Sequence, residues 1–376
     1  MVRILASDGM EKGAVTALEA KGCVVDQQFY DPEALKEAVK QYDVLVVRSA
    51  TKVRVPHIDA AKEAGKLKLI IRGGVGVDNI DVKYAEENGI TVRNTPRASS
   101  QSVAELALAH MFACARFVSI AGHTMREGKW EKKAYGKGIE LQGRTLGIIG
   151  FGRIGQHLGV MAKAIGMNVI AYDLYPVEGI EEQLGIPYVE MEELLKKSDF
   201  ISVHAPAVDG GAIINAETIA KMKDGVCIIN TSRGKNLDED ALLKALESGK
   251  VRAAGLDVFA TEPSQNAALY SHPMVSCTPH IGAATGEAQK RIGAEIVDLA
   301  AEEDVGRGKD DEAAVAYAEA PVLAYDLVVH AVAALGHVSD APPGEPLGHL
   351  APERYALGAL VLLKPVEQSH GGHAGV

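Results

Sequence analysis

Several features that mark other classes of protein are scarce or missing in this 376-residue sequence. Its 39 lysines and arginines are outnumbered by 50 acidic residues, giving a net charge of -11, so no basic excess exists to neutralise nucleic-acid phosphates. No run of about twenty apolar residues occurs, which argues against a membrane span. The four cysteines are Cys23, Cys114, Cys227 and Cys277. They lack the spacing of metal ligands, so we expect no metal site and buried free thiols in a reducing compartment.

The sequence otherwise has the composition of a globular protein that can bury large cores, 47% hydrophobic and 24% charged. Its first eight residues, Met1–Asp8, read as a short strand ending in an acid and not as a signal peptide. We therefore expect a cytoplasmic protein with no membrane or nucleic-acid partner.

Short apolar runs alternate with amphipathic segments along most of the chain. They predict strands at 2–6, 24–29, 44–47, 69–71 and 91–92, and near 146–149, 168–172, 200–203, 226–230, 252–256 and 275–277. Helical segments between the runs indicate βαβ units and parallel sheets covered on both faces. The predicted fold class is α/β, with two doubly wound, Rossmann-like parallel-sheet domains in tandem.

Two longer helical patterns accompany these units. One runs from Ser99 to about Met125 and is apolar on more than one face, which requires burial. The other, Thr285–Ala301, has apolar positions at helical spacing. The C-terminal segment 305–376 is rich in proline and histidine and carries no motif, so we expect a partly disordered tail and assign it no role.

The most informative segment is Leu146–Gly155, an apolar strand that runs into G-x-G-x-x-G. Gly150 permits the tight turn, Gly152 lets a pyrophosphate approach backbone amides, and Gly155 lets the next helix pack closely. The following strand ends at Asp173, whose carboxylate can accept both ribose hydroxyls of an adenosine. Glycines alone also mark ordinary turns, but the whole unit indicates a dinucleotide site. No Arg or Lys follows to pair with a 2′-phosphate, which favours NAD over NADP.

Three further polar residues follow predicted strands. They are Arg233, Glu262 and His280. Ligands of open α/β sheets gather beyond the carboxyl ends of strands, so these side chains are expected to converge. Imidazole can accept a hydroxyl proton and return it, a carboxylate can orient the ring, and a guanidinium can hold a substrate carboxylate. A surface arginine, a solvated glutamate and a structural histidine are the alternatives.

Together these motifs resemble those of the D-isomer-specific 2-hydroxyacid dehydrogenases, over residues 1–304. The resemblance implies that Arg233, Glu262 and His280 are catalytic and that a hydride is transferred to NAD. It implies a discontinuous substrate-binding domain at 1–97 and 284–304 around an NAD-binding domain at 98–283. The cofactor contacts implied or predicted are Ser102, Gly150, Gly152, Arg153, Ile154, Gly155, Asp173, His204, Pro206, Thr231, Asp257 and Gly282. A homodimer through the NAD domains is also implied, with the 99–125 helix as candidate interface.

Within the family, the segments 47–51, 72–81, 93–96 and 128–133 are similar to the phosphoglycerate dehydrogenase branch. That similarity implies oxidation of D-3-phosphoglycerate, the first step of serine biosynthesis. The implied substrate contacts are Arg48, Ser49, Gly74, Val75, Gly76 and Lys132, with Lys133 as an alternative to Lys132. The amides of residues 74–76 would bind the carboxylate, while Arg48 and a lysine would bind the phosphate. Solvated surface charges are the alternative for Arg48 and the lysines.

Two segments depart from the family pattern. The stretch Ala207–Gly211 replaces the usual Leu-Thr, which predicts weaker cofactor contacts there, and the last 72 residues do not resemble the family's regulatory serine-binding domain. A reductase of glyoxylate, hydroxypyruvate or another D-2-hydroxy acid is the nearest alternative function. An NAD-sensing protein like the corepressors of this fold is a second alternative.

Overall fold

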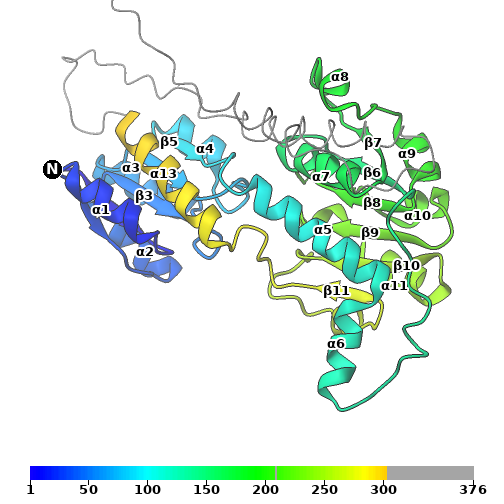
Figure 1. Ribbon diagram of the computed structural model, residues 1–376. Coiled ribbons are helices and arrows are strands. Elements are labelled where there is room, and N and C mark those ends of the chain that lie inside the picture. The colour runs from blue at the N-terminus through cyan, green and yellow to red at the C-terminus, as the bar shows by residue number, and fades with distance from the viewer. Residues whose placement is uncertain (208–209, 303–376) are drawn as a thin grey trace, which may run out of the picture. The chain divides into compact units, whose positions relative to one another are not determined.

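A computed structural model describes residues 1–207 and 210–302, which form two α/β lobes, each built on a parallel sheet (Figure 1). The fold class predicted from the sequence is therefore confirmed. The predicted tail at 305–376 lies outside the described residues.

The first lobe is built on a five-stranded sheet in the order β2-β1-β3-β4-β5, with every pairing parallel. Its strands are β1 (Arg3–Ala6), β2 (Val24–Asp26), β3 (Val44–Val47), β4 (Leu69–Arg72) and β5 (Thr91–Asn94). The helices between them are α1 (Lys12–Ala20), α2 (Pro32–Ala38), η1 (Val39–Gln41), α3 (Val55–Ala64) and α4 (Val82–Glu87). The edge strand β2 ends three residues earlier than predicted, because Phe29 is exposed and gains nothing from the sheet.

The last described helix, α13 (Gly286–Glu302), belongs to this first lobe although its sequence follows the second. It packs against α1 and β4. Gly293 lies so close to Ala14 that a Cβ there would come within 2.8 Å of the alanine Cβ. Its buried residues, Ile292 and Ile296 among them, share a core with β1, β3 and β4.

The second lobe has a six-stranded parallel sheet in the order β11-β10-β9-β8-β6-β7. The strands are β6 (Thr145–Ile149), β7 (Asn168–Tyr172), β8 (Phe200–Val203), β9 (Val226–Asn230), β10 (Val251–Leu256) and β11 (Val275–Cys277). Its helices are α7 (Arg153–Ala164), α8 (Ile180–Leu184), α9 (Met191–Lys197), α10 (Ala216–Lys221), η2 (Gly234–Asn236), α11 (Glu239–Ser248) and α12 (Ala267–Tyr270). A parallel bridge from Ala171 to Tyr188 extends the sheet beyond β7, which gives the Rossmann order 3-2-1-4-5-6 with β11 added as a seventh strand. The strand order therefore switches between β6 and β8, where such sheets bind ligands.

One helix was predicted over 99–125, and this prediction is wrong. The structure has α5 (Ser100–Arg116) and α6 (Val118–Arg126), bent by 69° at Phe117 (Figure 1). Phe117 is left-handed, with φ of 59°, and its ring contacts Tyr135 and the Arg252 guanidinium. These tertiary contacts hold a backbone conformation that a non-glycine residue rarely adopts.

The buried face of α5 packs against α7 and β10. Among the residues described, no single helix has the length and apolar composition of a membrane span, and the bent α5–α6 pair matches in those two respects only.

The cysteines are free, as predicted, but not all are buried. Cys114 and Cys227 are buried, and burial raises the pKa of both thiols. Cys23 is half-buried, whereas Cys277 is exposed at the end of β11. The prediction of a buried thiol is therefore wrong for Cys277, because an edge strand next to a cavity leaves its last side chain accessible.

Candidate active site

The glycine loop joins β6 to α7 at the switch point of the second sheet. Gly150 has φ of 90°, and a Cβ there would lie 2.6 Å from the backbone nitrogen of Ala205. A Cβ on Gly155 would lie 2.5 Å from the Gly150 carbonyl oxygen. Gly152 instead faces open space, which is where a pyrophosphate would approach the N-terminus of α7 and its first residues, Arg153 and Ile154. Two of the glycines therefore serve packing, and the third leaves room for a ligand.

Asp173 follows β7 and lies beside this loop. One carboxylate oxygen accepts a hydrogen bond from the Phe151 amide at 2.7 Å, and the other accepts from the Tyr175 amide at 2.9 Å. Each oxygen keeps a further lone pair for a ribose hydroxyl. The position is the one predicted for binding an adenosine.

Two buried polar atoms at neighbouring strand ends have no hydrogen-bond partner among the described residues. They are Nδ1 of His204, after β8, and Oγ1 of Thr231, after β9. His204 contacts Ser202 Oγ through Nε2 at 2.8 Å, and burial lowers its pKa to about 4, so the ring is neutral. Unsatisfied buried groups are rare in folded proteins. Together with the glycine loop they fit a polar dinucleotide at the switch point.

The departure predicted for the loop after Pro206 falls partly on Val208 and Asp209, which lie outside the described residues. The predicted contact at Ser102 has another partner, since its hydroxyl lies 2.7 Å from Thr285 Oγ1.

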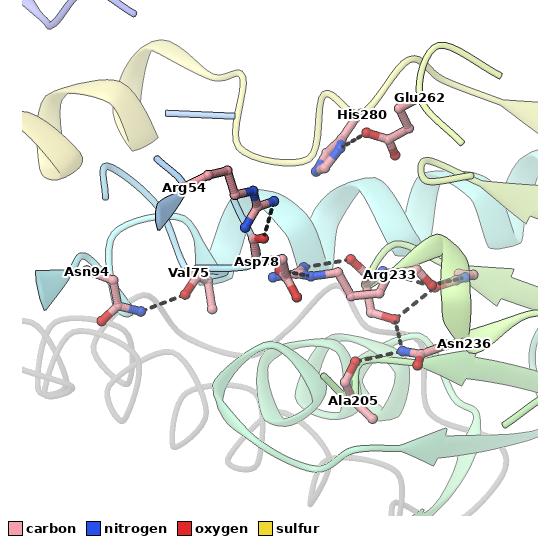
Figure 2. A network of polar contacts seen from close by, with 11 residues as sticks. Arg54, Val75, Asp78, Asn94, Ala205, Arg233, Asn236, Glu262 and His280 are labelled. Carbon is pink, nitrogen blue, oxygen red and sulfur yellow. Dashed lines mark hydrogen bonds and ion pairs between the residues drawn. The ribbon is translucent and has the colours of Figure 1, made fainter. Parts of the chain in front are cut away.

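Glu262 and His280 form a hydrogen-bonded pair, with 2.7 Å between Glu262 Oε2 and His280 Nδ1 (Figure 2). Burial opposes ionisation of the carboxyl, but the hydrogen bond and charge of His280 prevail and hold the pKa of Glu262 below its ordinary value. Glu262 is therefore a carboxylate at neutral pH, so Nδ1 carries the shared proton. Nε2 is left to exchange a proton with a substrate hydroxyl.

The loop that carries His280 is held by Asp257, whose side chain is 1% exposed. One carboxylate oxygen accepts hydrogen bonds from Thr278 Oγ1 at 2.6 Å and from the Ile281 amide at 2.8 Å. The other accepts from the Gly282 amide at 2.9 Å. His280 itself is left-handed, with φ of 54°, and its amide donates to the Asp257 carbonyl. In the structure, Gly282 donates its amide hydrogen to Asp257. The cofactor contacts of these two residues stay predictions.

Arg233 extends from the end of β9 to the first lobe. Its Nε donates to Asp78 Oδ2 at 2.7 Å, and Nη1 donates to the Ser232 carbonyl at 2.8 Å (Figure 2). Nη2 lies against Gly76, where a Cβ would be only 1.4 Å away. The guanidinium thus lies directly on the loop whose amides were predicted to bind a carboxylate.

This loop, residues 73–78, is fixed by side chains of its own lobe. Asn94 donates to the Val75 carbonyl at 2.6 Å, and Arg54 donates to the Asp78 carbonyl at 3.1 Å (Figure 2). The Asp78 carboxyl is partly buried, which opposes ionisation, but the charge and hydrogen bond of Arg233 hold its pKa below the ordinary value. The loop, the carboxylate and the guanidinium form one preorganised unit.

A second arginine, Arg72, lies under the same loop at the end of β4. Its Nε is buried without a hydrogen-bond partner among the described residues, and a Cβ on Gly74 would lie 1.4 Å from its Nη1. Burial, and then the positive charges of Arg233 and Arg48, lower the pKa of Arg72 to about 10. The carboxylates of Asp78 and Asp8 offset part of this effect, and an anion bound among the three guanidinium groups would offset more of it.

The Glu262–His280 pair opens onto a cavity of about 550 Å³. Ser49 and Ala50 line it from the first lobe, and Glu262 and His280 line it from the second. Lys132 is not brought to this site by any contact described. It is exposed in the 127–140 segment, which is tied to α6 through Tyr135 and Thr124, so its phosphate contact stays a prediction.

Comparison with known proteins decides the family. The model described as "D-isomer specific 2-hydroxyacid dehydrogenase, NAD binding domain" matches residues 108–282. Hydroxypyruvate reductase of Thermotoga maritima is 50% identical over 301 residues, which are 79% of this chain and 96% of that protein. The chain belongs to the D-isomer-specific 2-hydroxyacid dehydrogenases. The matched segment is the family's NAD-binding domain, so the predicted cofactor, NAD, is confirmed.

Other members of the family differ in length and in name. D-3-phosphoglycerate dehydrogenase of Methanocaldococcus jannaschii is 47% identical over 300 residues, 79% of this chain but 56% of that protein. The chain thus spans about half the length of such relatives. A glyoxylate reductase structure from Paecilomyes thermophila is 33% identical with a TM-score of 0.73, covering 82% of this chain and 96% of that one.

Two side chains around the 73–78 loop, Arg72 and Asp78, were not predicted as site residues. Both lie in the 72–81 segment that resembles the phosphoglycerate dehydrogenase branch. Arg72 directly follows the predicted strand 69–71, which is the same signal that identified Arg233. Asp78 follows in the glycine-rich loop, but its partner is 155 residues away, and no local pattern indicates such a contact.

Proposed function

We propose that this dehydrogenase oxidises D-3-phosphoglycerate to 3-phosphohydroxypyruvate with NAD. The observation that carries the proposal is that three arginine side chains lie against the 73–78 loop, Arg48 beside Gly73, Arg72 beside Gly74 and Arg233 beside Gly76. Asp78 and Asp8 offset part of the positive charge, and a substrate with both a carboxylate and a phosphate would offer one anionic group to Arg233 and another to Arg48 and Arg72.

The chain's own residues account for binding and proton transfer. Arg233 and the amides of Gly74, Val75 and Gly76 would hold the carboxylate, and Arg48 and Arg72 would hold the phosphate. His280 Nε2 would accept the proton of the C2 hydroxyl, and Glu262 would stabilise the imidazolium through Nδ1. When bound, NAD accepts the hydride from C2.

Reduction of hydroxypyruvate is the second candidate. It is supported by the relative from Thermotoga maritima, which is named for that reaction and is matched over almost its whole length. The proton and hydride would move by the same steps in reverse. The difference lies in whether Arg48 and Arg72 meet a phosphate.

Steady-state kinetics with NADH separate the two candidates. We would compare phosphohydroxypyruvate, hydroxypyruvate and glyoxylate, with His280→Ala as the blank. Preference for the phosphorylated acid that Arg48→Gln abolishes, while turnover of hydroxypyruvate is kept, would support the first candidate. Preference for hydroxypyruvate that is insensitive to Arg48→Gln would contradict the phosphate site and favour the second.

NAD binding without turnover of any of these acids would instead favour the NAD-sensing alternative. In that case His280→Ala would leave partner binding unchanged.

We also propose a homodimer through the NAD-binding lobe. Phe112 on α5 and Val118 and Met125 on α6 are large apolar side chains exposed in the single chain. Burial of such a surface is favourable. Light scattering of Val118→Glu with Met125→Glu should give a monomer where the native chain gives a dimer. The cytoplasmic location stays a prediction.

A further inference from the structure

A chain of hydrogen bonds leads to the loop that carries His280. Its last member, Asp257, is a predicted cofactor contact, whereas the members before it would touch neither substrate nor cofactor. It begins at Ser119 on α6, whose Oγ lies 2.8 Å from Ser276 Oγ. Ser276 Oγ lies 3.0 Å from Nδ1 of His110, on α5, and Nε2 of His110 lies 3.1 Å from Thr278 Oγ1. Thr278 Oγ1 then donates to Asp257 Oδ1 at 2.6 Å.

The chemistry of the groups fixes the direction of this chain. An ionised Asp257 only accepts, so the Thr278 hydroxyl hydrogen is committed to it. Thr278 Oγ1 must therefore accept from His110, which places the imidazole hydrogen on Nε2. Nδ1 is then an acceptor, so Ser276 donates to it and Ser119 donates to Ser276. Each O–H and N–H hydrogen in the chain is used once, and every donor meets an acceptor.

His110 is rigidly held in this tautomer. It is 3% exposed, and burial lowers its pKa, so the ring stays neutral. Gly255 of β10 packs against it so closely that a Cβ at position 255 would lie 2.5 Å from the histidine Cβ. The close packing against β10 prevents the ring from moving away from Thr278, so its Nε2–H is a fixed donor toward the Thr278 hydroxyl.

We propose that His110 is a positioning residue of the active site. By fixing the Thr278 hydroxyl it sets the orientation of Asp257, which in turn binds the amides of Ile281 and Gly282. Those bonds hold the loop that presents His280 to Glu262. The inference rests on the proposed hydride-transfer chemistry, but not on which 2-hydroxy acid is the substrate.

Substitutions at His110 can remove the hydrogen bonds of its two ring nitrogens separately. Gln can place an N–H near the position of Nε2 and keep the bond to Thr278, while Asn is shorter and reaches only the Ser276 side. Leu removes both bonds. We expect His110→Leu and His110→Asn to lower kcat about 10-fold to 100-fold with little change in substrate KM, the range typical of residues that orient a functional group without touching the reactant. His110→Gln should recover most of the loss.

A double-variant cycle tests whether His110 acts through Thr278. If it does, His110→Leu should add little to the loss already caused by Thr278→Val, whereas independent roles would give additive losses. The matched control is His123→Asn, which changes an exposed histidine of α6 that pairs with Glu127.

Hydrogen exchange gives a readout that does not need turnover. The amides of Ile281 and Gly282 should exchange faster in His110→Leu and at the native rate in His110→Gln. If the native enzyme turns over none of the acids, the proposed function fails, yet exchange still tests the inference. Native exchange in folded His110→Leu, or additive losses in the cycle, would overturn it. If His110→Leu does not fold, the Gln and Asn pair provides the same comparison.

Discussion

Placing a single methyl group at position 76 should disable the site without unfolding the protein. A Cβ on Gly76 would lie 1.4 Å from Arg233 Nη2, 2.5 Å from its Cζ and 2.9 Å from Asp78 Oδ2. Ordinary carbon contacts begin near 3.5 Å, so the guanidinium must move by about 2 Å. That displacement removes it from Asp78 and from the place where a substrate carboxylate would lie.

The substitution should weaken transition-state binding while leaving the free energy of unfolding almost unchanged. Losing the charge-assisted hydrogen bonds to the carboxylate costs about 3 kcal/mol of transition-state binding, which lowers kcat/KM roughly 150-fold. The free energy of unfolding should change by less than about 1 kcal/mol, since Asp78 is largely exposed and its ion pair contributes little, while Gly→Ala stabilises slightly through the unfolded chain.

The assay is steady-state kinetics with NADH, together with urea unfolding of the same preparation. Gly286→Ala is the matched control, because a Cβ at the start of α13 meets nothing within 4 Å. A Gly76→Ala enzyme with near-native kcat/KM would refute the assigned position of Arg233. An equal loss of activity in Gly286→Ala would show that the effect is not specific to the loop.

Three further changes test other parts of the site. Asp78→Asn keeps the shape but not the charge that orients Arg233, so kcat/KM should fall about 10-fold, and unchanged kinetics would contradict the pairing. His204 has a folded pKa near 4, below its ordinary 6.5, so the unfolded state gains a proton first as pH falls. Native stability should then drop by about 2 kcal/mol between pH 7 and pH 5, and His204→Gln should show a shallower drop in urea unfolding. Gly150→Ala combines a left-handed backbone with a Cβ 2.6 Å from Ala205, so denaturant unfolding should show a loss of about 3 kcal/mol or more, and native stability would refute the clash.

The elements that could be predicted are those with a local cause. Buried parallel strands such as β8 and β9 are short, mostly apolar runs of sequence, and the turn at Gly150 needs a residue that tolerates positive φ. Both features can be recognised from a few consecutive residues. The same reasoning selected Arg233, Glu262 and His280 as candidate site residues, because each follows a strand.

What the sequence could not predict depends on contacts between distant segments. The break at Phe117 lies in a good helical pattern and is held by Tyr135 and Arg252 from other segments. His110 looked like one more member of an apolar helix, since its partners Ser276 and Thr278 come more than 160 residues later. Periodicity reports which face of an element is buried but not what it meets there.

The division of the site between two stretches of chain bears on how substrate range can change. The proposed acid–base pair, Glu262 and His280, lies on the loops after β10 and β11, whereas the groups that would recognise the substrate's anions lie mostly on the segments after β3 and β4. Arg233, which follows β9 in the second lobe, contacts Asp78 in the 73–78 loop of the first lobe. Substitutions in the first lobe can therefore change which hydroxy acid is bound without changing Glu262 and His280, the residues proposed to transfer the proton. A new specificity in this architecture needs few mutations, and they should cluster within residues 48–78.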